Sequence, residues 1–324
     1  MMWHTAFSAL LPAFLLAVAS TTVFAQAYPS RAIDFTVHTA PGGGTDVFAR
    51  AVTDILQKEK IITQPLIVTN RTGGGGAVAF NHIKTRRGDP YSMLTVATGS
   101  LLTNVARPEL GLGLDIYTPL AYFATDPQAI MVGADSKFST MKDLIEAARK
   151  QPDTIVCAVT SAGGSGRVAL YHIEKATGVK FKFVTFKGGG DAVLAVVGGH
   201  VHFTTENLSE AAGMIEAKKL RVIGMTTEKR LPQYPGFPTL IEQGVNVAIG
   251  TGRGFAMPAG VPKEAAAFME AALEKVHKSK AWQDFSYKNV FEDRWLNSVQ
   301  FAAYLVQKQA EMQDFLQSVG LAKP

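Results

Sequence analysis

The sequence repeats one pattern four times: an apolar strand, a glycine-rich turn and then a helix. The first copy spans residues 35–50, FTVHTAPGGGTDVFAR, in which Phe35 and Val37 alternate with polar residues before Pro41. The second copy follows residues 66–68, and the last two follow residues 154–159 and 182–186. Strands that alternate with helices at this spacing predict an α/β fold with mainly parallel sheets, one for each pair of units.

Each glycine turn is suited to an anion. Free backbone N–H groups and the positive end of the helix dipole point at whatever lies above such a turn. We expect Thr45 or Asp46 to cap the first helix and Asp191 to cap the fourth. Ligands of open α/β sheets bind at the carboxyl ends of parallel strands, so two lobes facing each other there would enclose a cleft. The alternative is that these turns serve chain geometry only.

The ends and the composition suggest an exported chain with two lobes. Residues 1–25 end in an apolar run and Val-Phe-Ala, which is typical of a signal peptide; an uncleaved anchor is the alternative. The remaining chain, about 300 residues, exceeds what one core usually supports. We expect residues 26–126 and 229–324 to form one lobe and 127–228 the other. Cys157 is the only cysteine, so no intramolecular disulfide is expected, and it is predicted to be a buried strand residue.

Several motifs of other functional classes are missing. Val47 and Phe48 stand where a phosphate-binding loop needs Gly-Lys, and the first turn lacks the third glycine of a dinucleotide fingerprint. Arg167 replaces the last glycine of a nucleophile elbow. The formal charge of +5 comes without a Lys/Arg cluster, which disfavours nucleic acid. His200 and His202 have a chelating spacing, but no acid or cysteine completes a metal site. We therefore expect no cofactor and no metal.

Two side chains near the turns have two interpretations each. His38 stands at the mouth of the first turn, where a neutral imidazole could orient a ligand or be satisfied by the backbone. Arg253, in the glycine-rich stretch 250–254, stands at a predicted crossing between the lobes. Its guanidinium could bind a ligand carboxylate in bidentate fashion or form a salt bridge to the other lobe.

The chain resembles the Bug/TctC family of extracytoplasmic solute receptors. The resemblance begins with Tyr28-Pro29-Ser30-Arg31, then Pro41-Gly42-Gly43-Gly44-Thr45-Asp46 and Ala49-Arg50. It continues in register through residues 70–76, 161–166, 186–192, 198–199, 207–208, 238–244 and 258–262. Three departures leave the ligand open: His38 and Thr39 replace apolar residues, residues 88–91 scramble a Pro-Asp-Gly-Tyr element, and residues 250–254 lack a tryptophan.

The resemblance implies a periplasmic binding protein of the two-lobe, type II-like class, without catalysis. Its first-lobe turns would hold a carboxylate by backbone and water, and the second lobe would close on the rest. The glycine turns and the neighbouring titratable side chains give the residues expected to bind the ligand: His38, Thr39, Ala40, Gly42, Gly43, Gly44, Thr45, Asp46, Gly74, Gly75, Gly76, Ala77, Thr98, Gly99, Ser100, Ser161, Ala162, Gly163, Ser165, Gly166, Gly188, Gly189, Gly190, Asp191, Glu206 and Arg253.

The function expected is capture of a small mono- or dicarboxylate, aromatic acids included, in the periplasm. The receptor, expected to be a monomer, would deliver it to the membrane components of a tripartite tricarboxylate transporter. One alternative is an exported enzyme that uses Ser165 or Ser100 with His38. Another is a ligand-loaded sensor that contacts the ectodomain of a membrane kinase.

Overall fold

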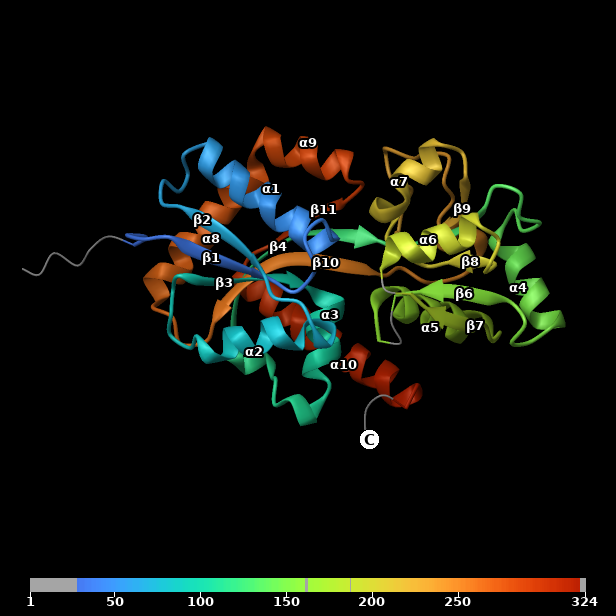
Figure 1. Ribbon diagram of the computed structural model, residues 1–324, viewed down its shortest axis with the longest axis horizontal. Coiled ribbons are helices and arrows are strands. Elements are labelled where there is room, and N and C mark those ends of the chain that lie inside the picture. Colours follow the sequence, from blue (N-terminus) through green and yellow to red (C-terminus); the bar gives the residue numbers. More distant parts are fainter. Residues whose placement is uncertain (1–27, 161–162, 187, 321–324) are drawn as a thin grey trace, which may run out of the picture.

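The computed structural model describes residues 28–160, 163–186 and 188–320. The expected signal peptide and two expected ligand-binding residues, Ser161 and Ala162, lie outside this range. Within it, the strands form two sheets that lie side by side, each flanked by helices (Figure 1). The two-lobe α/β class predicted from the sequence is confirmed.

The first lobe is built on a sheet of six described strands in the order β11-β4-β10-β3-β1-β2. Its strands are β1 (Ile33–Val37), β2 (Leu66–Asn70), β3 (Ser92–Ala97), β4 (Tyr117–Pro127), β10 (Gly250–Pro258) and β11 (Glu292–Leu296). Its helices are α1 (Gly44–Lys58), α2 (Ala77–Thr85), α3 (Thr98–Val105), α8 (Lys263–Lys278), α9 (Lys280–Lys288) and α10 (Ser298–Ser318).

The second lobe is built on five described strands in the order β7-β6-β8-β5-β9. Its strands are β5 (Ala129–Gly133), β6 (Val156–Val159), β7 (Lys182–Thr185), β8 (Phe203–Thr204) and β9 (Leu220–Met225). Its helices are α4 (Met141–Lys150), α5 (Ser165–Thr177), α6 (Gly189–Val197) and α7 (Leu208–Glu216).

Both sheets are mixed, so the expectation of mainly parallel sheets was wrong. The strands of the glycine units do pair in parallel: β1 with β2 and β3, and β6 with β7 and β8. In the first sheet, however, β10 is antiparallel to β3 and β4, and in the second β5 is antiparallel to β8 and β9. The reason is the connection between the lobes. β4 leads the chain out of the first lobe and β10 brings it back, so these neighbours run in opposite directions.

The segment between β9 and β10 packs on the second lobe. Leu240, Val245 and Val247 are buried in one of its cores. Leu231, together with the partly buried Tyr234, belongs to the other. These residues bury their apolar side chains against strands β5 and β9 and not against the first sheet. We therefore propose that the second lobe runs to about residue 249, beyond the expected boundary at 228.

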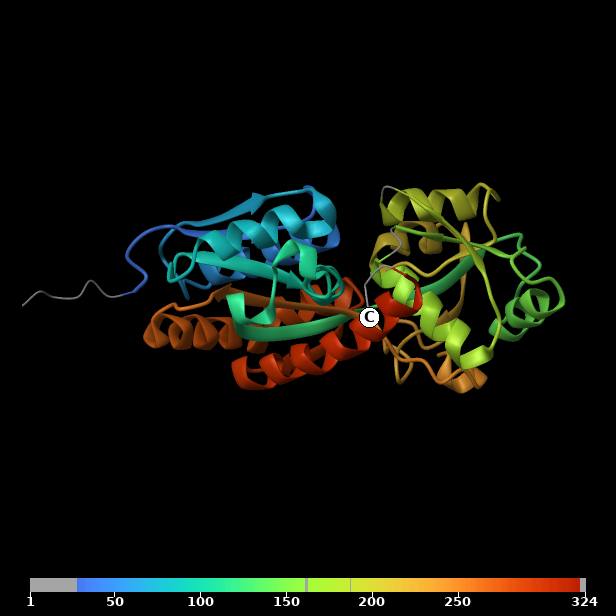
Figure 2. The same ribbon diagram turned by 90° about the horizontal axis from the view of Figure 1, so that it is seen from below.

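One core is shared between the lobes. Val168 of α5 belongs to the apolar cluster formed by α3, α10 and the first sheet. Tyr171 of α5 packs on Phe315 of α10 with ring centroids 5.1 Å apart. Lys175 forms an ion pair with Asp314 at 3.2 Å. Figure 2 shows α10 running under the first lobe to reach α5, so the last helix connects the two halves.

Candidate ligand-binding cleft

Five helices begin at the facing edges of the two sheets without a side-chain cap. In the described chain, α1, α2, α3, α5 and α6 have Gly43, Gly76, Ala97, Gly164 and Gly188 at the N-cap position, and none makes a side-chain cap hydrogen bond. Of the helices away from this edge, α4, α9 and α10 are capped by Thr140, Ser279 and Asn297, whereas α8, which follows Pro262, has no side-chain cap. A helix without a cap leaves its first N–H groups without an internal partner. The uncapped ends therefore present backbone N–H groups without a side-chain cap at the facing sheet edges.

The predictions of side-chain caps were wrong. Thr45 and Asp46 lie in the first turn of α1, which begins at Gly44 after Gly43, and Asp191 lies in the first turn of α6. Thr98, Gly99 and Ser100, which were expected to bind the ligand, form the first turn of α3, because the helix follows β3 directly. In each case the chain turns without using a polar side chain at the N-cap.

Asp46 holds the first glycine turn in shape. One carboxylate oxygen accepts the Gly42 N–H at 2.8 Å, and the other accepts the Asn70 side-chain amide at 2.8 Å. Arg50 donates to the same carboxylate at 3.0 Å. Burial alone would raise the pKa of Asp46, but these hydrogen bonds outweigh it and lower the pKa. Asp46 thus fixes the conformation of the turn.

Arg253 is paired inside the protein. Its Nη2 donates to Asp126 at 2.5 Å and its Nη1 to Thr45 at 3.0 Å, and its side chain is 5% exposed. A Cβ on Gly44 would lie 2.8 Å from Nη2, so the guanidinium sits directly against the first turn. Burial raises the pKa of Asp126, and the Arg253 charge opposes that rise. Arg253 does form a salt bridge, but its partner Asp126 lies on the neighbouring strand β4 of the same sheet and not in the other lobe.

His38 lies between the first and second turns. Its ring is 8% exposed, stacks on Phe80, and approaches the backbone at Gly76, where a Cβ would lie 3.4 Å from Cδ2. Burial, and then the Arg253 charge, lower the pKa of His38 to about 4, so the ring is neutral at pH 7. Among the described contacts Nδ1 has no hydrogen-bond partner, and His38 makes no hydrogen bond to Ser100 or Ser165. The pairing of His38 with Ser165 or Ser100 that the enzyme alternative used is not formed among the described residues.

The second and third turns of the site are fixed by polar contacts. The Asn104 amide donates to the Gly75 carbonyl at 2.9 Å, which anchors residues 74–76. The Thr98 hydroxyl accepts the Gly252 N–H at 2.8 Å, which ties the first turn of α3 to β10. Across the lobes, a Cβ on Gly99 would lie 3.6 Å from that of Ser165. The helix starts of α3 and α5 therefore meet where the lobes face each other.

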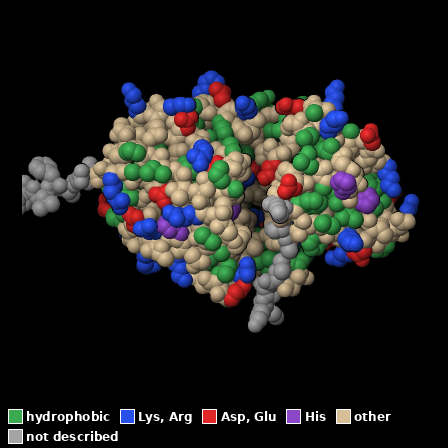
Figure 3. Space-filling view, in the orientation of Figure 1, with side chains coloured by type: hydrophobic (Ala, Val, Ile, Leu, Met, Phe, Trp, Pro, Cys, Tyr) green, Lys and Arg blue, Asp and Glu red, His purple; other side chains and the backbone are tan. Residues whose placement is uncertain are grey.

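Two acids of the second lobe lie beside its glycine turns. The Thr160 N–H donates to Oε1 of Glu206 at 2.8 Å, and a Cβ on Gly166 would lie 2.7 Å from that oxygen. A Cβ on Gly189 would overlap the carboxylate of Glu210, which is exposed. Burial, and then the charge of Glu210, raise the pKa of Glu206 to about 8. Figure 3 shows the surface hollowed where the lobes meet, with acidic side chains at its rim.

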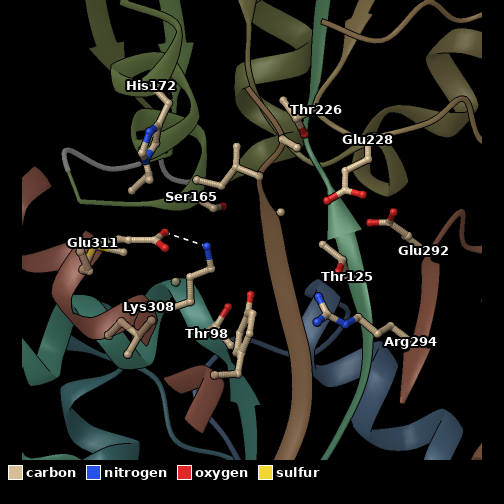
Figure 4. Close-up of a pocket in the computed structure, with 18 of the residues that line it drawn as sticks. Thr98, Thr125, Ser165, His172, Thr226, Glu228, Glu292, Arg294, Lys308 and Glu311 are labelled. Atoms are coloured by element: carbon tan, nitrogen blue, oxygen red, sulfur yellow. Dashed lines mark hydrogen bonds and ion pairs between the residues drawn. The ribbon is translucent and has the colours of Figure 1, made fainter. Parts of the chain in front are cut away.

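A pocket of about 460 Å³ lies between the lobes beside β10. Of the predicted residues, Thr98, Gly99 and Ser165 line it, whereas the first, second and fourth glycine turns do not. The other lining residues were not predicted from the sequence: Leu102, Thr125, Val168, His172, Thr226, Glu228, Ala248, Ile249, Gly250, Glu292, Asp293, Arg294, Tyr304, Lys308, Glu311 and Met312. In Figure 4, Ser165 and Thr98 lie on one side of the crossing strand and Glu228, Glu292 and Arg294 on the other.

Sequence reasoning missed Asp126 and Glu210. Each is a single acid in a stretch without a motif, and their partners lie far away in the sequence: Arg253 is 127 positions after Asp126. For Asp126 the only local signal was its position at the end of a strand, directly before Pro127. At Glu210 no signal distinguishes the residue from an ordinary surface glutamate of α7.

The described residues offer neither a metal-binding cluster nor a helix suited to a membrane. They contain no group of three or more His, Cys, Asp or Glu side chains placed to hold a metal ion. No helix in the described ranges combines the length and the apolar character that a membrane span requires.

The fold and the cleft edge define a solute-binding protein with two lobes. Residues 48–321 match the model of the tripartite tricarboxylate transporter family receptor, TctC, and the chain belongs to this family. Among curated relatives it is 28% identical over 271 residues to a UPF0065 protein from the tcbD-tcbE intergenic region of Pseudomonas sp. strain P51, which covers 82% of this chain and 80% of that one. It is 26% identical over 231 residues to BugT of Bordetella pertussis, 68% of each chain.

Solved structures of the same architecture cover nearly the whole chain. A TctC solute-binding protein from Polaromonas is 30% identical with a TM-score of 0.73, covering 90% of this chain and 99% of that one. A Rhodopseudomonas palustris protein solved with adipate has a TM-score of 0.82 at 23% identity, with 91% and 99% covered. MatC from R. palustris, solved with malate, has a TM-score of 0.76 at 21% identity, with 89% and 99% covered.

Proposed function

We propose that this protein is a periplasmic receptor that captures a small carboxylate between its lobes and delivers it to a tripartite tricarboxylate transporter. The observation that carries the proposal is the set of five uncapped helix starts at the facing sheet edges. Backbone N–H groups at helix N-termini favour an anion. Membership of the receptor family supports delivery to a transporter of this kind, and two structural neighbours were solved with adipate and malate.

The first glycine turn is the expected position of the ligand carboxylate. It is preorganised by Asp46, so few degrees of freedom remain to be fixed on binding. When the lobes close, the bound ligand would contact both of them. These additional contacts would shift the population from the open to the closed conformation.

The test is Gly43→Asp, which places a negative charge at the uncapped start of α1. We expect it to abolish carboxylate binding, because like charges repel at a site that presents only donors. Binding is followed by thermal unfolding of the mature protein, freed of bound solute, against a panel of acids with their amides as controls. A ligand at 100 times its dissociation constant adds about 2.7 kcal/mol to the stability of the wild type. Unchanged affinity in the variant would show that this turn does not hold the carboxylate.

Gly178→Ala serves as the control for a glycine change in the same fold. Gly178 ends α5 with a positive φ of 70°, away from the cleft edge, and a Cβ there would meet no atom within 4 Å. We expect a small loss of stability from backbone strain and no loss of affinity. Loss of affinity in this control would mean that any strained glycine substitution disturbs the cleft.

A further inference from the structure

Two carboxylates face each other in the pocket beside β10, one from each lobe. Glu228 follows the end of β9 in the second lobe, and Glu292 begins β11 in the first. Both line the pocket, and in Figure 4 their carboxylates point toward one another. Glu228 is exposed and Glu292 is half-buried. Within the described part of the chain, neither side chain belongs to an ion pair.

The charge of one acid acts on the other. Burial, and then the charge of Glu228, raise the pKa of Glu292, while the charge of Arg294 on the same strand opposes this rise to a smaller extent. The Arg294 guanidinium is directed over the ring of Tyr304, with its carbon 5.8 Å from the centroid. When both acids are ionised, the repulsion between them therefore exceeds the attraction that Arg294 provides.

The other titratable groups of the pocket do not neutralise the pair. On α10, Lys308 forms an ion pair with Glu311 at 2.7 Å. On β11, the carboxylate of Asp293 lies 3.0 Å from the His277 ring. His172 of α5 also lines the pocket, and burial lowers its pKa, so its ring is neutral at pH 7. The bases of the neighbouring elements are thus engaged elsewhere or uncharged.

The crossing strands separate this acid pair from the glycine turns. In the first sheet, β1 and β2, which carry the first two turns, lie on one side of β4 and β10, and β11 forms the opposite edge. In the second sheet, β6 and β7, which carry the last two turns, lie on one side of β5, and β9, which leads to Glu228, forms the opposite edge. The acid pair and the glycine turns therefore lie on opposite sides of the connection between the lobes.

We propose that Glu228 and Glu292 form a lever behind the hinge, in which repulsion between the two carboxylates favours closure of the cleft. Rotation of the lobes about the crossing strands moves the two sides of the hinge in opposite directions. Separation of the acids therefore brings the glycine turns together, and loss of either charge removes this bias. The inference concerns the conformational equilibrium of the lobes, goes beyond the proposed function, and is testable without a ligand.

The experiment measures the distance between the lobes in the mature, ligand-free protein. Asn81→Cys on α2 and Leu194→Cys on α6 place one exposed thiol on each lobe, on the helices that follow the second and fourth glycine turns. Cys157 is fully buried, so a nitroxide reagent labels the two new thiols. Double electron–electron resonance then gives the distribution of label distances, which shortens as the cleft closes.

The main variant is Glu228→Lys, which turns the repulsion from Glu292 into attraction. We expect longer label distances than in the wild-type background, because the acid side of the hinge draws together and the turn side opens. Glu292→Gln should shift the distances in the same direction by less. The control is Glu216→Lys, which makes the same charge change at an exposed position of α7 in the same lobe. Its distances should match the wild type.

The pH gives a second measurement on the same labelled protein. Because the pKa of Glu292 is raised, its charge is lost at a higher pH than that of an ordinary glutamate. From pH 8 to pH 5 the label distances should therefore lengthen, and Glu292→Gln should reduce this response. A pH response of the same size in the variant would overturn the role of Glu292.

Ligand affinity should follow the closed fraction. For an acid that binds the wild type, Glu228→Lys should weaken binding by up to about fivefold, the range of a partly exposed charge interaction. Unchanged or shorter label distances in Glu228→Lys would overturn the inference and leave the carboxylate receptor standing. An equal shift in Glu216→Lys would overturn the assignment to this pair. If the distances lengthen as expected but no carboxylate binds, the proposed function fails and the lever stands.

Discussion

Asp126, the penultimate residue of β4, accepts a hydrogen bond from Arg253 on the neighbouring strand β10, and both side chains are almost fully buried. The pair lies where the chain leaves the first lobe and where it returns. Thr45 of α1 shares the guanidinium, and Ser209 of α7 donates to the carboxylate at 3.4 Å. One buried ion pair therefore joins the first glycine turn to a helix of the second lobe.

Breaking this pair should destabilise the fold strongly. Asp126→Asn leaves Arg253 as a buried charge without a counter-ion, and such losses cost about 3–5 kcal/mol. Urea unfolding measures the change. The control is Lys278→Gln, which removes an exposed ion pair to Glu274 and should cost less than about 1 kcal/mol. Equal effects in the two variants would mean that Arg253 finds another partner or water when Asp126 is neutral.

His38 should make stability fall in mild acid. Its pKa is 6.5 in the unfolded chain and about 4 in the folded protein, so only the unfolded chain takes up a proton between these values. Its contribution is complete above pH 6.5 and is lost as the pH falls toward 4, by at most about 3 kcal/mol. His38→Asn should flatten the curve of unfolding free energy against pH over this window. The exposed His200→Asn is the control, and an unchanged slope in the His38 variant would contradict the assignment.

Phe315 should couple the unfolding of the two lobes. Its ring is fully buried, packs on Tyr171 of the second lobe, and lies 6.0 Å from the Arg167 guanidinium carbon. Phe315→Ala should cost about 3–5 kcal/mol and split thermal unfolding into two calorimetric transitions. Phe301→Ala on the same helix is the matched control, because that ring packs on Tyr122 within the first lobe. A single transition in both variants would show that the remaining contacts suffice for cooperativity.

The Cys157 thiol should be unreactive toward disulfide reagents in the native protein. It is completely buried in β6, and burial raises the pKa of its thiol. Because the thiolate is the reactive form, a disulfide reagent at pH 8 should label it only after unfolding in urea. Lys150→Cys places an exposed thiol on α4 and should react at once. Rapid labelling of Cys157 in the wild type would reveal frequent opening of the second sheet.

The sequence was sufficient to predict the units that repeat a local pattern. The strand before Pro41 and the helices that follow the four glycine turns were predictable, because periodicity and glycine turns are local signals. The crossing strand β4 and the short β11 were not predicted. Their places are set by partners more than a hundred residues away in β10 and β4, and no local pattern encodes that pairing.

In the candidate site, too, only the features with a local sequence signal were predictable. The glycine turns were found because backbone geometry demands glycine at Gly42 and Gly76, both with positive φ. Whether an acid nearby caps its helix, pairs with an arginine or stays unpaired depends on tertiary neighbours. Asp46 was found but was assigned a cap that it does not form, and Glu210 could not be distinguished from a surface residue.

The strand order of the first sheet constrains the order in which the two lobes can be completed as the chain is synthesised from its N-terminus. β4 pairs only with β10 and β11 among the described strands, so it has no sheet partner until residues 250–258 are available. The second lobe is a continuous segment between the two crossings. A chain truncated after residue 249 should therefore protect the second lobe from protease and leave β4 susceptible. The half that contains the N-terminus is then the last to be finished, and the cleft cannot form until the strands of residues 250–258 and 292–296 have joined the first sheet.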